Sequence, residues 1–458
     1  MAIVNGEVSF WYADGGLPEP GPALTEDTTA DVAVVGAGYT GLWTAYYLKQ
    51  ARPELDVVVL ESRFAGFGAS GRNGGWLTNS MTGGREDYAA SHGRELTGRF
   101  QTLLNETVDE VIRVAAAEGI DADIAKGGEL IVARNPAQQQ RLQDWAAAES
   151  VWPEAGARLL DAAETSQRIR IDRAVGSLFQ PHCARIQPAK LVRGLADTVR
   201  RMGVRLYEGT TVTEILPNQA RTDRGTVEAR YILRATEGFT AGLKSAHRDW
   251  LPMNSSLIVT EPLPEHVWTQ IGWDGAEALG DMAHAYMYAQ RTSDGRIALG
   301  GRGVPYRYGS GLDTDGATQP KTVAQLADIL HSMFPATRSA RLEHAWSGVL
   351  GVPRDWKATV GLDPQTGLGW AGGYVGTGVA ATNLAARTLR DLIVDPGSEL
   401  TRMPWVNRKV RRWEVEPLRW LAVKAMYSAY HAADRAENGR LKSTSLIARM
   451  ADKVSGRS

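Results

Sequence analysis

The sequence of 458 residues contains one cysteine, Cys183, and only eight histidines. A single cysteine cannot form an intramolecular disulfide, and we interpret it as a small buried hydrophobic residue because no catalytic signature surrounds it. The histidines form no H-E-x-x-H motif, and His182, His284 and His344 each stand alone in the sequence, which predicts structural roles for them. A G-x-S-x-G hydrolase motif is also absent. The sequence therefore predicts no metal site and no hydrolase.

Long apolar runs and an excess of positive charge are missing as well. No stretch approaches the roughly 20 apolar residues that a membrane helix needs. Lys and Arg total 51 against 52 Asp and Glu, a net charge of -1, so the basic excess of nucleic-acid-binding proteins is lacking. The N-terminal sequence MAIVNGEVSFWYADGG has no basic region followed by an apolar run. We expect a cytoplasmic protein with a small-molecule partner, no nucleic acid and no membrane span.

The clearest local pattern follows an N-terminal arm, residues 1–29, that is rich in Pro, Gly and Thr and is expected to lie on the surface. Residues 31–35 form an apolar run typical of a strand, which stops at Gly36 and is followed by a helical pattern. A second buried strand is predicted over 56–60 and ends at Glu61. This order of strand, glycine turn, helix and strand predicts a βαβ unit.

The glycine turn has the G-x-G-x-x-G pattern of a dinucleotide-binding fingerprint. Gly36 permits the tight turn, Gly38 lets the backbone approach a pyrophosphate, and Gly41 lets the helix pack closely on the strand. Glu61 lies 20 positions after Gly41, where an acid is expected to bind ribose hydroxyl groups. A purely structural glycine turn is the alternative interpretation. With strand, helix and acid all in place, dinucleotide binding is favoured.

Further elements alternate along the chain. Helical spacing predicts helices over 96–117, 188–202 and 379–393, and apolar runs predict strands over 129–133, 204–208, 231–234 and 369–371. Nucleotide-type elements near both ends imply a discontinuous cofactor domain with a second domain inserted. We expect the cofactor domain over 30–90, 170–245 and 345–400, the substrate domain over 91–169 and 246–344, and a helical tail over 401–458.

A second glycine-rich loop, GFGASGRNGGW over residues 66–76, follows Glu61 closely. A nicotinamide-dependent enzyme has no need for such a loop. In this loop the sequence resembles the flavin-dependent D-amino-acid oxidase and glycine oxidase superfamily, and most closely its gamma-glutamylputrescine oxidoreductase branch. The resemblance extends over the segments SFWY, VAVVGAGYTGLWTAYYL, IQPAKLVRGLADTVRRMGVRLYEGTTV, RATEGFT, IALGGRG and GGYVGTGVA.

This resemblance implies an α/β fold. It consists of a discontinuous FAD-binding Rossmann-like domain of the glutathione reductase type and an inserted α+β substrate domain over the flavin. The resemblance also implies FAD as the cofactor. Relatives with covalent FAD attach it through a cysteine shortly before the last glycine loop, where this chain has Trp346-Ser-Gly348, so we expect non-covalent FAD.

The resemblance assigns cofactor contacts residue by residue. Val212 would meet the adenine through its backbone, and the family form Ala-Thr-Asn-Gly at the pyrophosphate crossing has Glu237 in place of Asn here, which puts a direct cofactor contact by this side chain in question. The expected cofactor-binding residues are Gly36, Gly38, Tyr39, Thr40, Gly41, Glu61, Ser62, Arg63, Gly68, Ala69, Ser70, Arg72, Asn73, Gly74, Gly75, Val212, Ala235, Thr236, Gly238, Gly373, Gly376, Thr377, Gly378 and Val379.

The last glycine loop, 373–378, leads from a predicted strand into a helix. In the resembled family this helix points its N-terminus at the pyrimidine edge of the flavin, where free N–H groups stabilise the negative charge of the reduced form. Thr377, Gly378 and Val379 are the candidate donors. An ordinary strand-to-helix turn is the alternative.

The sequence signals for substrate-binding residues are less specific than those for cofactor-binding residues. In the resembled family a sheet of the inserted domain covers the flavin, and strands are expected here over 283–290 and 296–302. The pocket candidates are Trp76, Tyr286, Arg302, Trp346 and Tyr374. For each of them alone, core packing or a surface ion pair is an equal alternative, and no catalytic side chain is assigned.

The expected activity is that of a FAD-dependent oxidoreductase. No second strand-GxGxxG-helix unit is present for NAD(P)H, so the electrons should come from the substrate. We expect a C–N bond of an amine or amino acid to become an imine by hydride transfer to flavin N5, with oxygen or an electron carrier as the acceptor. Two alternatives are a flavin oxidoreductase acting on a hydroxyl group or a reduced ring, and a flavin-binding protein with weak turnover and a role in assembly.

Overall fold

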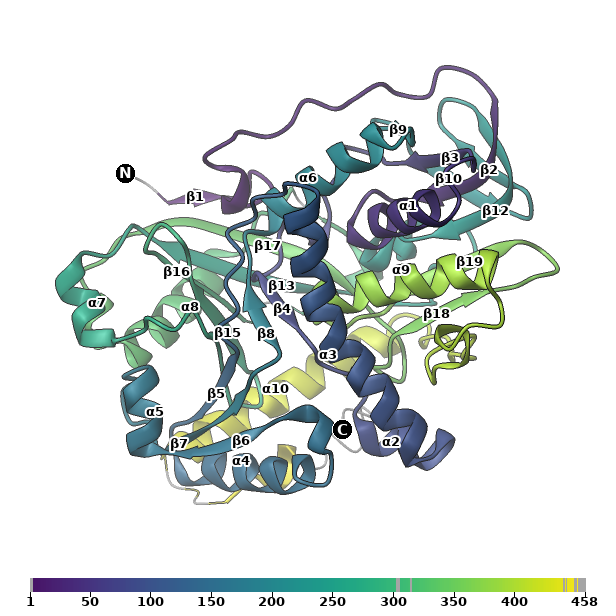
Figure 1. The fold of residues 1–458 in the computed structure, drawn as a ribbon. Helices are drawn as coiled ribbons and strands as arrows, with labels where there is room; N and C mark the ends of the chain where they lie inside the picture. Colours follow the sequence, from purple (N-terminus) through teal and green to yellow (C-terminus); the bar gives the residue numbers. More distant parts are fainter. Residues whose placement is uncertain are drawn as a thin grey trace.

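The computed structural model of the chain describes residues 3–301, 305–313, 315–439, 441, 443–448 and 451. Within these residues the strands form an eight-stranded sheet, a nine-stranded sheet and a two-stranded sheet. Figure 1 shows the eight-stranded sheet with helices α1 and α9 at the upper right and the nine-stranded sheet at the left. The mixed α/β class predicted from the sequence is confirmed.

The eight-stranded sheet has a parallel centre in which distant parts of the chain meet. Its order is β10-β11-β12-β2-β3-β9, and β19 pairs with β12 on one side and with β18 on the other. The parallel strands are β2 (Thr28–Val35), β3 (Val57–Leu60), β9 (Arg205–Tyr207), β12 (Thr226–Arg234) and β19 (Leu368–Gly372). The antiparallel strands are β10 (Val212–Leu216), β11 (Gln219–Thr222) and β18 (Thr359–Leu362).

Helices cover this sheet and explain its continuous apolar runs. Every residue of β3 is buried, as expected for a parallel strand covered on both faces. Helix α1 (Tyr39–Ala51) packs against α9 (Gly378–Val394) and α6 (Pro188–Arg201), and α3 (Arg94–Ala117) lies against α9. Because α9 belongs to the C-terminal part of the chain, the two ends of the sequence share one core.

The nine-stranded sheet has the order β1-β17-β13-β16-β15-β14-β5-β7-β6. Its strands are β1 (Val4–Asn5), β5 (Glu129–Ala133), β6 (Arg158–Asp161), β7 (Gly176–Gln180), β13 (Leu251–Thr260), β14 (Ala278–Asp281), β15 (Met287–Arg291), β16 (Ile297–Gly301) and β17 (Leu342–Val352). The helices outside the eight-stranded sheet are α2 (Arg85–His92), α4 (Pro136–Glu149), α5 (Ala162–Arg168), α7 (Glu265–Ile271), α8 (Pro320–Met333) and α10 (Leu418–Gly439). Short 3-10 helices are η1 (Phe10–Tyr12), η2 (Ala69–Gly71), η3 (Pro153–Ala155), η4 (Glu237–Gly242), η5 (Tyr308–Ser310), η6 (Pro335–Thr337) and η7 (Leu400–Arg402).

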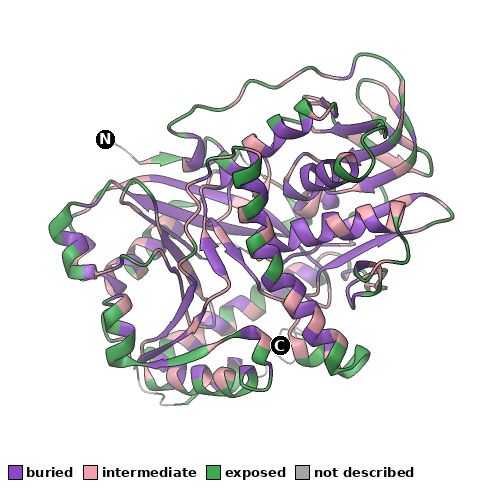
Figure 2. Ribbon diagram, in the orientation of Figure 1, coloured by how far each residue is buried: buried purple, intermediate pink, exposed green. Residues whose placement is uncertain are grey.

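A small sheet of two strands that are far apart in the sequence lies between the two large sheets and their helices. Strand β4 (Trp76–Thr78) begins directly after the glycine-rich loop 66–76 and pairs antiparallel with β8 (Cys183–Arg185). Strand β8 also lies next to β14 of the nine-stranded sheet. Strand β4 itself lies against α9 and α3, so it is held between the helices that cover the eight-stranded sheet and, through β8, the nine-stranded sheet. In Figure 2 the central strands are almost entirely buried, and the helices expose only their outer faces.

Two local expectations differ from the structure. The strand expected over 283–290 begins only at Met287, because the segment before it is a turn in which the N–H groups of Ala283 and Met287 donate to Asp281. The N-terminal arm does not simply lie on the surface, since Trp11 and Tyr12 are buried and β1 pairs with β17. The domain boundaries stay a prediction.

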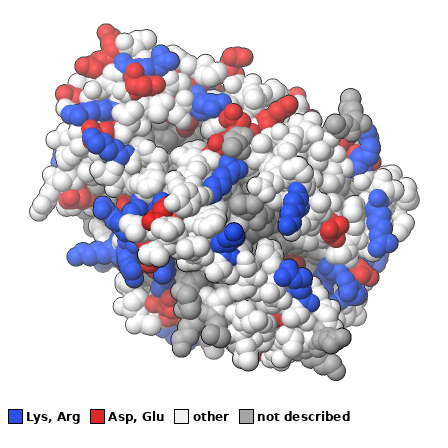
Figure 3. Space-filling model, turned by 180° about the vertical axis from the view of Figure 1, so that it is seen from behind, with Lys and Arg blue, Asp and Glu red and all other residues white. Residues whose placement is uncertain are grey.

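The surface carries both signs of charge, and Figure 3 shows Lys and Arg interspersed with Asp and Glu on the back of the molecule. In the tail, Trp405 and Trp413 are buried, and α10 packs on β13 and β17 through Val423, Tyr427 and Tyr430. None of the helices in the described part of the chain is long and apolar enough to span a membrane.

Candidate functional site

A cavity of about 410 Å³ opens where the loops after β2, β3, β12 and β19 meet. This is the carboxyl edge of the parallel strands, the usual place for a ligand in an open α/β sheet. The volume lies within the roughly 300–1,000 Å³ of typical small-molecule sites. The lining comes from three separate stretches of the chain, approximately 35–78, 210–257 and 348–382, with Tyr286, Tyr288 and Leu312 added from the second sheet and its loops.

The first glycine loop forms the floor of the cavity. Gly36 has a φ of +105°, and a Cβ on it would lie 2.7 Å from the carbonyl oxygen of Ala235. A Cβ on Gly41 would lie 1.9 Å from the carbonyl oxygen of Gly36, so only glycine allows α1 to start this close to β2. Gly38 lines the cavity, and the N–H group of Tyr39 donates to the hydroxyl oxygen of Ser70 at 2.8 Å. The two glycine-rich loops therefore meet at the N-terminus of α1.

Glu61 marks one end of the cavity. Its carboxylate accepts hydrogen bonds from the N–H groups of Ala37 and Arg63, both at 3.0 Å, which fix its orientation. Burial raises the pKa of Glu61 above its ordinary value, partly opposed by these hydrogen bonds. Ser62 and Val212 line the cavity beside it, as expected, and Thr210 joins them.

The second glycine loop is held rigid by its own polar side chains. The amide of Asn73 donates to the carbonyl oxygens of Ala69 and Ser70 and accepts from the N–H group of Gly75. Arg72 is only 1% exposed and forms a buried ion pair with Asp313 at 2.7 Å. The Nη2 atom of Arg72 has no hydrogen-bond partner among the described residues.

Glu237 connects the pyrophosphate-crossing loop to the last glycine loop. Its two carboxylate oxygens accept from the N–H groups of Gly373 and Tyr374, both at 3.1 Å. Burial raises the pKa of Glu237 to about 7, against the lowering effect of these N–H groups. Glu237 lines the cavity, and its carboxylate is engaged with the protein.

The N-terminus of α9 reaches the cavity through Gly376, Thr377, Gly378 and Val379. No side chain caps this helix. The N–H group of Thr377, one of the three expected donors, already donates to the carbonyl oxygen of Tyr374 at 3.0 Å. Of the three, Gly378 and Val379 therefore remain as candidate donors toward a ligand.

Aromatic side chains surround the other end of the cavity. Trp76, Tyr286 and Tyr374 line it as expected, and Tyr288 joins them. The rings of Trp76 and Tyr288 meet edge to face with centroids 6.2 Å apart, and the Tyr288 hydroxyl lies 2.8 Å from the hydroxyl of Ser255. The chamber is thus apolar with a few fixed hydroxyl groups.

Several expected residues do not line the cavity. Trp346 on β17 is fully buried and donates to the carbonyl oxygen of Arg72 from the other side of the loop, because the strand alternation turns its ring toward Trp11 and His344. Arg302 lies outside the described residues. The remaining expected residues that lie behind the lining are Gly41, Arg63, Gly75, Gly238 and Gly373.

Other residues that line the cavity were not expected from the sequence. Thr78, Ser255, Tyr288 and Leu312 line the cavity, and the hydroxyl of Thr78 donates to the buried carboxylate of Glu129. Thr78 could have been found, since it lies two residues after Trp76 on the same face of a strand. Glu129 and Leu312 could not, because only the packing of the two sheets and their loops brings them to the site.

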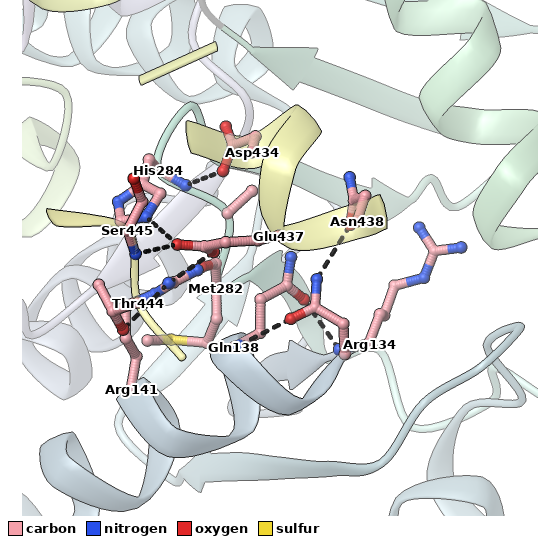
Figure 4. Close-up of polar contacts among 12 residues, drawn as sticks. Arg134, Gln138, Arg141, Met282, His284, Asp434, Glu437, Asn438, Thr444 and Ser445 are labelled. Atoms are coloured by element: carbon pink, nitrogen blue, oxygen red, sulfur yellow. Dashed lines mark hydrogen bonds and ion pairs between the residues drawn. The ribbon is translucent and has the colours of Figure 1, made fainter. Parts of the chain in front are cut away.

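One polar cluster outside the cavity contains His284, for which the sequence predicts a structural role. Figure 4 shows His284, Asp434 and Glu437 close together where α10 meets the turn before β15. Asp434 accepts from the N–H groups of His284 and Ala285, and Glu437 accepts from the His284 ring at 2.9 Å. Arg141 and Ser445 also donate to Glu437. These hydrogen bonds connect α10 to the turn that carries Tyr286.

The shape and donors of the cavity fit the FAD expected from the sequence. The unsubstituted Cα of Gly38 and the start of α1 leave room and positive potential for a pyrophosphate, and Glu61 is placed for ribose hydroxyl groups. A Cβ on Gly74 would lie 2.6 Å from the ring of Tyr288, so the second loop comes as close to the aromatic chamber as glycine permits. Cys183, the sole cysteine of the chain, is buried on β8 and is not part of the lining.

Comparison with known proteins agrees with this geometry. The family model described as FAD dependent oxidoreductase (DAO) matches residues 31–392. The gamma-glutamylputrescine oxidoreductase of Escherichia coli (strain K12) is 32% identical over 400 residues, covering 84% of this chain and 88% of that protein. The structure of glycine oxidase from Geobacillus kaustophilus matches with a TM-score of 0.70 at 19% identity, over 83% of this chain and 99% of that chain. L-proline dehydrogenase from P. horikoshii matches with a TM-score of 0.68 at 16% identity, over 82% and 96%.

Proposed function

Because the chain belongs to the DAO family of FAD-dependent oxidoreductases, we propose that it oxidises a C–N bond of an amine or amino acid to an imine. The main support for this proposal is the shape of the cavity. A single cavity joins a dinucleotide cradle around Gly38 and Glu61 to an aromatic chamber around Trp76 and Tyr286. A cofactor held in the cradle would place its reactive part beside a substrate in the chamber.

Bound FAD supplies the hydride acceptor of this chemistry, the flavin N5 atom. The residues of the chain supply position and the exclusion of water. Trp76, Tyr286 and Tyr288 would hold the substrate by apolar contact, and the buried ring of Tyr374 closes the chamber toward α9. The imine is released and hydrolyses afterwards.

The aromatic chamber also favours one protonation state of the substrate. An ammonium group loses its hydration among Trp76, Tyr286 and Tyr288, which lowers the pKa of a bound amine. A hydride leaves the carbon next to nitrogen readily only when the nitrogen lone pair is free. The neutral amine is therefore the reactive form, and the reduction rate should rise with pH to a plateau.

The curated relatives support the substrate class. Their names include gamma-glutamylputrescine oxidoreductase and sarcosine oxidase subunit beta, which describe an amine and an amino acid as substrates of those proteins. For this chain we propose the class alone, with oxygen or an electron carrier as the final acceptor.

Anaerobic reduction of the purified holoenzyme tests the proposal. A panel of amines and amino acids, beginning with gamma-glutamylputrescine, glycine, sarcosine and L-proline, is mixed with the protein, and the flavin absorbance is followed. We expect at least one of them to bleach the flavin within seconds, and NADH and NADPH to fail. Rapid bleaching by NADPH, or by an alcohol panel with no response to amines, would reject the proposed reaction.

A further inference from the structure

A buried acid lies one hydroxyl group away from the substrate end of the cavity. Glu129, the first residue of β5, is 6% exposed, and its Oε2 atom accepts a hydrogen bond from the Oγ1 atom of Thr78 at 2.8 Å. Thr78 lines the cavity at the end of β4, two residues after Trp76. The hydroxyl of Thr78 thus connects the cavity to the carboxylate of Glu129. The proposed function assigns no role to this connection.

Thr78 has the donors and acceptors that a proton relay needs. A hydroxyl group donates one hydrogen bond and accepts two. Thr78 Oγ1 donates to Glu129 and lies 3.2 Å from the hydroxyl of Ser80, and it also contacts the thiol of Cys183. When either of these two neighbours directs its proton elsewhere, a lone pair of Thr78 accepts from an N–H donor in the cavity. A proton can therefore arrive on the Thr78 oxygen as its own hydroxyl proton leaves toward Glu129.

The surroundings of Glu129 leave its charge without compensation. Among the described residues no Lys or Arg lies within ion-pair distance of Glu129, and the carboxylate of Glu149 on α4, which does act on it, is itself paired with Arg85. Cys183 on β8 also faces it, and burial raises the pKa of that thiol well above its usual range, so it stays neutral. Burial raises the pKa of Glu129 to about 7, more than the Thr78 hydrogen bond lowers it, and the charge of Glu149 adds to the increase.

We propose that Glu129 accepts, through Thr78, the proton that a substrate ammonium group must lose before oxidation. The inference rests on the proposed function. In this step an N–H bond of the ammonium breaks and its proton goes to Thr78 Oγ1, whose own proton passes to Glu129 Oε2. The cation and the carboxylate become a neutral amine and a neutral carboxylic acid. No electrons move, and two buried charges disappear, which a site closed to water favours.

The central test compares the pH dependence of flavin reduction in the wild-type holoenzyme and in Glu129→Gln. The probe is the amine of the panel above that bleaches the wild-type flavin fastest, with gamma-glutamylputrescine tried first. General acid–base groups contribute about 10²–10⁴-fold, so we expect about a 100-fold slower reduction by the variant near neutral pH. The difference should shrink to a few-fold as the pH rises past about 10.4, the pKa of an alkylammonium group, where the free amine becomes the main form in solution.

Two changes at Thr78 separate the relay from a structural role. Thr78→Val keeps the shape and removes only the hydroxyl, so it should reproduce the pH profile of Glu129→Gln. Thr78→Ser restores the hydroxyl and should return the wild-type profile. The control is Glu277→Gln, which alters a Glu that is 2% exposed and paired with Arg168 outside the lining. Its pH profile should match that of the wild type.

A second measurement needs no turnover. Infrared difference spectra of the holoenzyme between about pH 5 and about pH 9 should contain the loss of a buried carboxylic acid band. Glu237 and Asp281, whose pKa values burial raises to about 7 and about 6, contribute to the same spectral region. The Glu129 component should be missing in Glu129→Gln, which leaves a smaller band, and the full band should be present in Glu277→Gln.

The outcomes distinguish the two proposals. If no amine reduces the wild-type flavin, the proposed function fails and this inference with it. If the wild type is reduced but Glu129→Gln and Thr78→Val slow the reaction by the same factor at every pH, the relay is rejected and the proposed function stands. An infrared spectrum unchanged by Glu129→Gln would also reject the relay.

Discussion

At the scale of single residues, the side chain of Glu237 ties two loops together beside the cavity. Its backbone has a φ of +43°, and its carboxylate holds the N–H groups of Gly373 and Tyr374. The departure from the family's Asn was visible in the sequence, but its partners were not. They lie 136 and 137 positions away, and only the pairing of β12 with β19 brings them together.

Replacement of Glu237 by Gln should reveal this carboxyl in the pH dependence of stability. Because its folded-state pKa of about 7 lies above the ordinary value of 4.5, its stabilising contribution is complete below about pH 4.5 and is lost as the pH rises through about 7. The shift corresponds to up to about 3 kcal/mol. Glu237→Gln also turns one amide NH₂ toward a backbone N–H, which costs about 1–3 kcal/mol.

The expected result is a variant that is less stable than the wild type at about pH 5 and that gains on it by about pH 8. Equilibrium urea unfolding of the two apoproteins at both pH values measures the gap. Glu19→Gln, an exposed change in the N-terminal segment, is the control and should leave the gap constant. A gap for Glu237→Gln that is independent of pH would contradict the raised pKa.

At the scale of elements, the start of α9 is the part of the site most open to a direct test. Gly378 is the first residue of the helix, and proline is tolerated at that position because its missing N–H has no partner within the helix. Gly378→Pro should therefore keep the helix and remove one donor from the cavity. If this donor stabilises reduced flavin, the loss of about 0.5–1 kcal/mol lowers the midpoint potential by roughly 10–20 mV.

Gly378→Ala is the matched control, since it adds a similar contact with the ring of Tyr374 and keeps the N–H group. Redox titration of the three holoenzymes gives the potentials. A potential for Gly378→Pro that equals that of Gly378→Ala would mean that this N–H group does not act on the flavin.

The hydrogen bonds between helix α10 and the turn that carries Tyr286 allow a second test at this scale. Burial of Glu437 works against ionisation, but the hydrogen bonds from His284, Ser445 and Arg141 outweigh it and lower its pKa to about 2. A lowered pKa stabilises the fold above the ordinary value of 4.5, and the contribution is lost as the pH falls toward about 2. Glu437→Gln should therefore lower the thermal midpoint at about pH 7 and should differ less from the wild type at about pH 3.

Calorimetric scans at the two pH values provide the comparison. The exposed change Glu265→Gln on α7 is the control. An equal loss of midpoint at both pH values would show that the Glu437 carboxylate does not act through its charge.

The same elements show what the sequence could predict. The unit β2-α1-β3 follows from local signals, since apolar runs, three glycines and Glu61 lie within one stretch of chain. The strand β15 begins later than alternation alone predicts, because Asp281 and Asp434 hold residues 283–286 in a turn. Trp346, a pocket candidate from the sequence, does not line the cavity, because its ring packs on the face of β17 that meets the loop of Arg72. Local sequence patterns predicted the cofactor-binding loops. The residues that line the substrate chamber depend on long-range packing, which such patterns do not show.

At the scale of the whole molecule, the lining of the cavity offers contacts for both halves of a dinucleotide. Glu61 and Val212 line one end of the cavity, where they would contact the adenosine that FAD has and FMN lacks. We expect the purified protein to release FAD and no FMN on denaturation, as checked by chromatography of the supernatant. Gly38→Val should yield a colourless protein, because even a Cβ would lie 2.9 Å from Ser70 Oγ and the valine methyl groups would occupy the backbone approach.

The control for this change is Gly439→Val at the end of α10, where a Cβ meets nothing within 4 Å. It should retain the flavin. Flavin that stays on the denatured chain would overturn the expectation of non-covalent FAD, and a yellow Gly38→Val variant would overturn the role of the first glycine loop.

The place of β12 between β2 and β19 has a consequence for how the protein is made. About 330 residues separate the end of β2 from the start of β19, so at roughly 5–20 residues per second a ribosome needs on the order of 20–60 s to travel between them. Until then the nascent chain carries the first glycine loop beside an uncovered strand edge and has no α9 to close the cradle. We therefore expect the cofactor to bind only when the polypeptide is nearly finished, and the half-built sheet to be prone to aggregation during that interval.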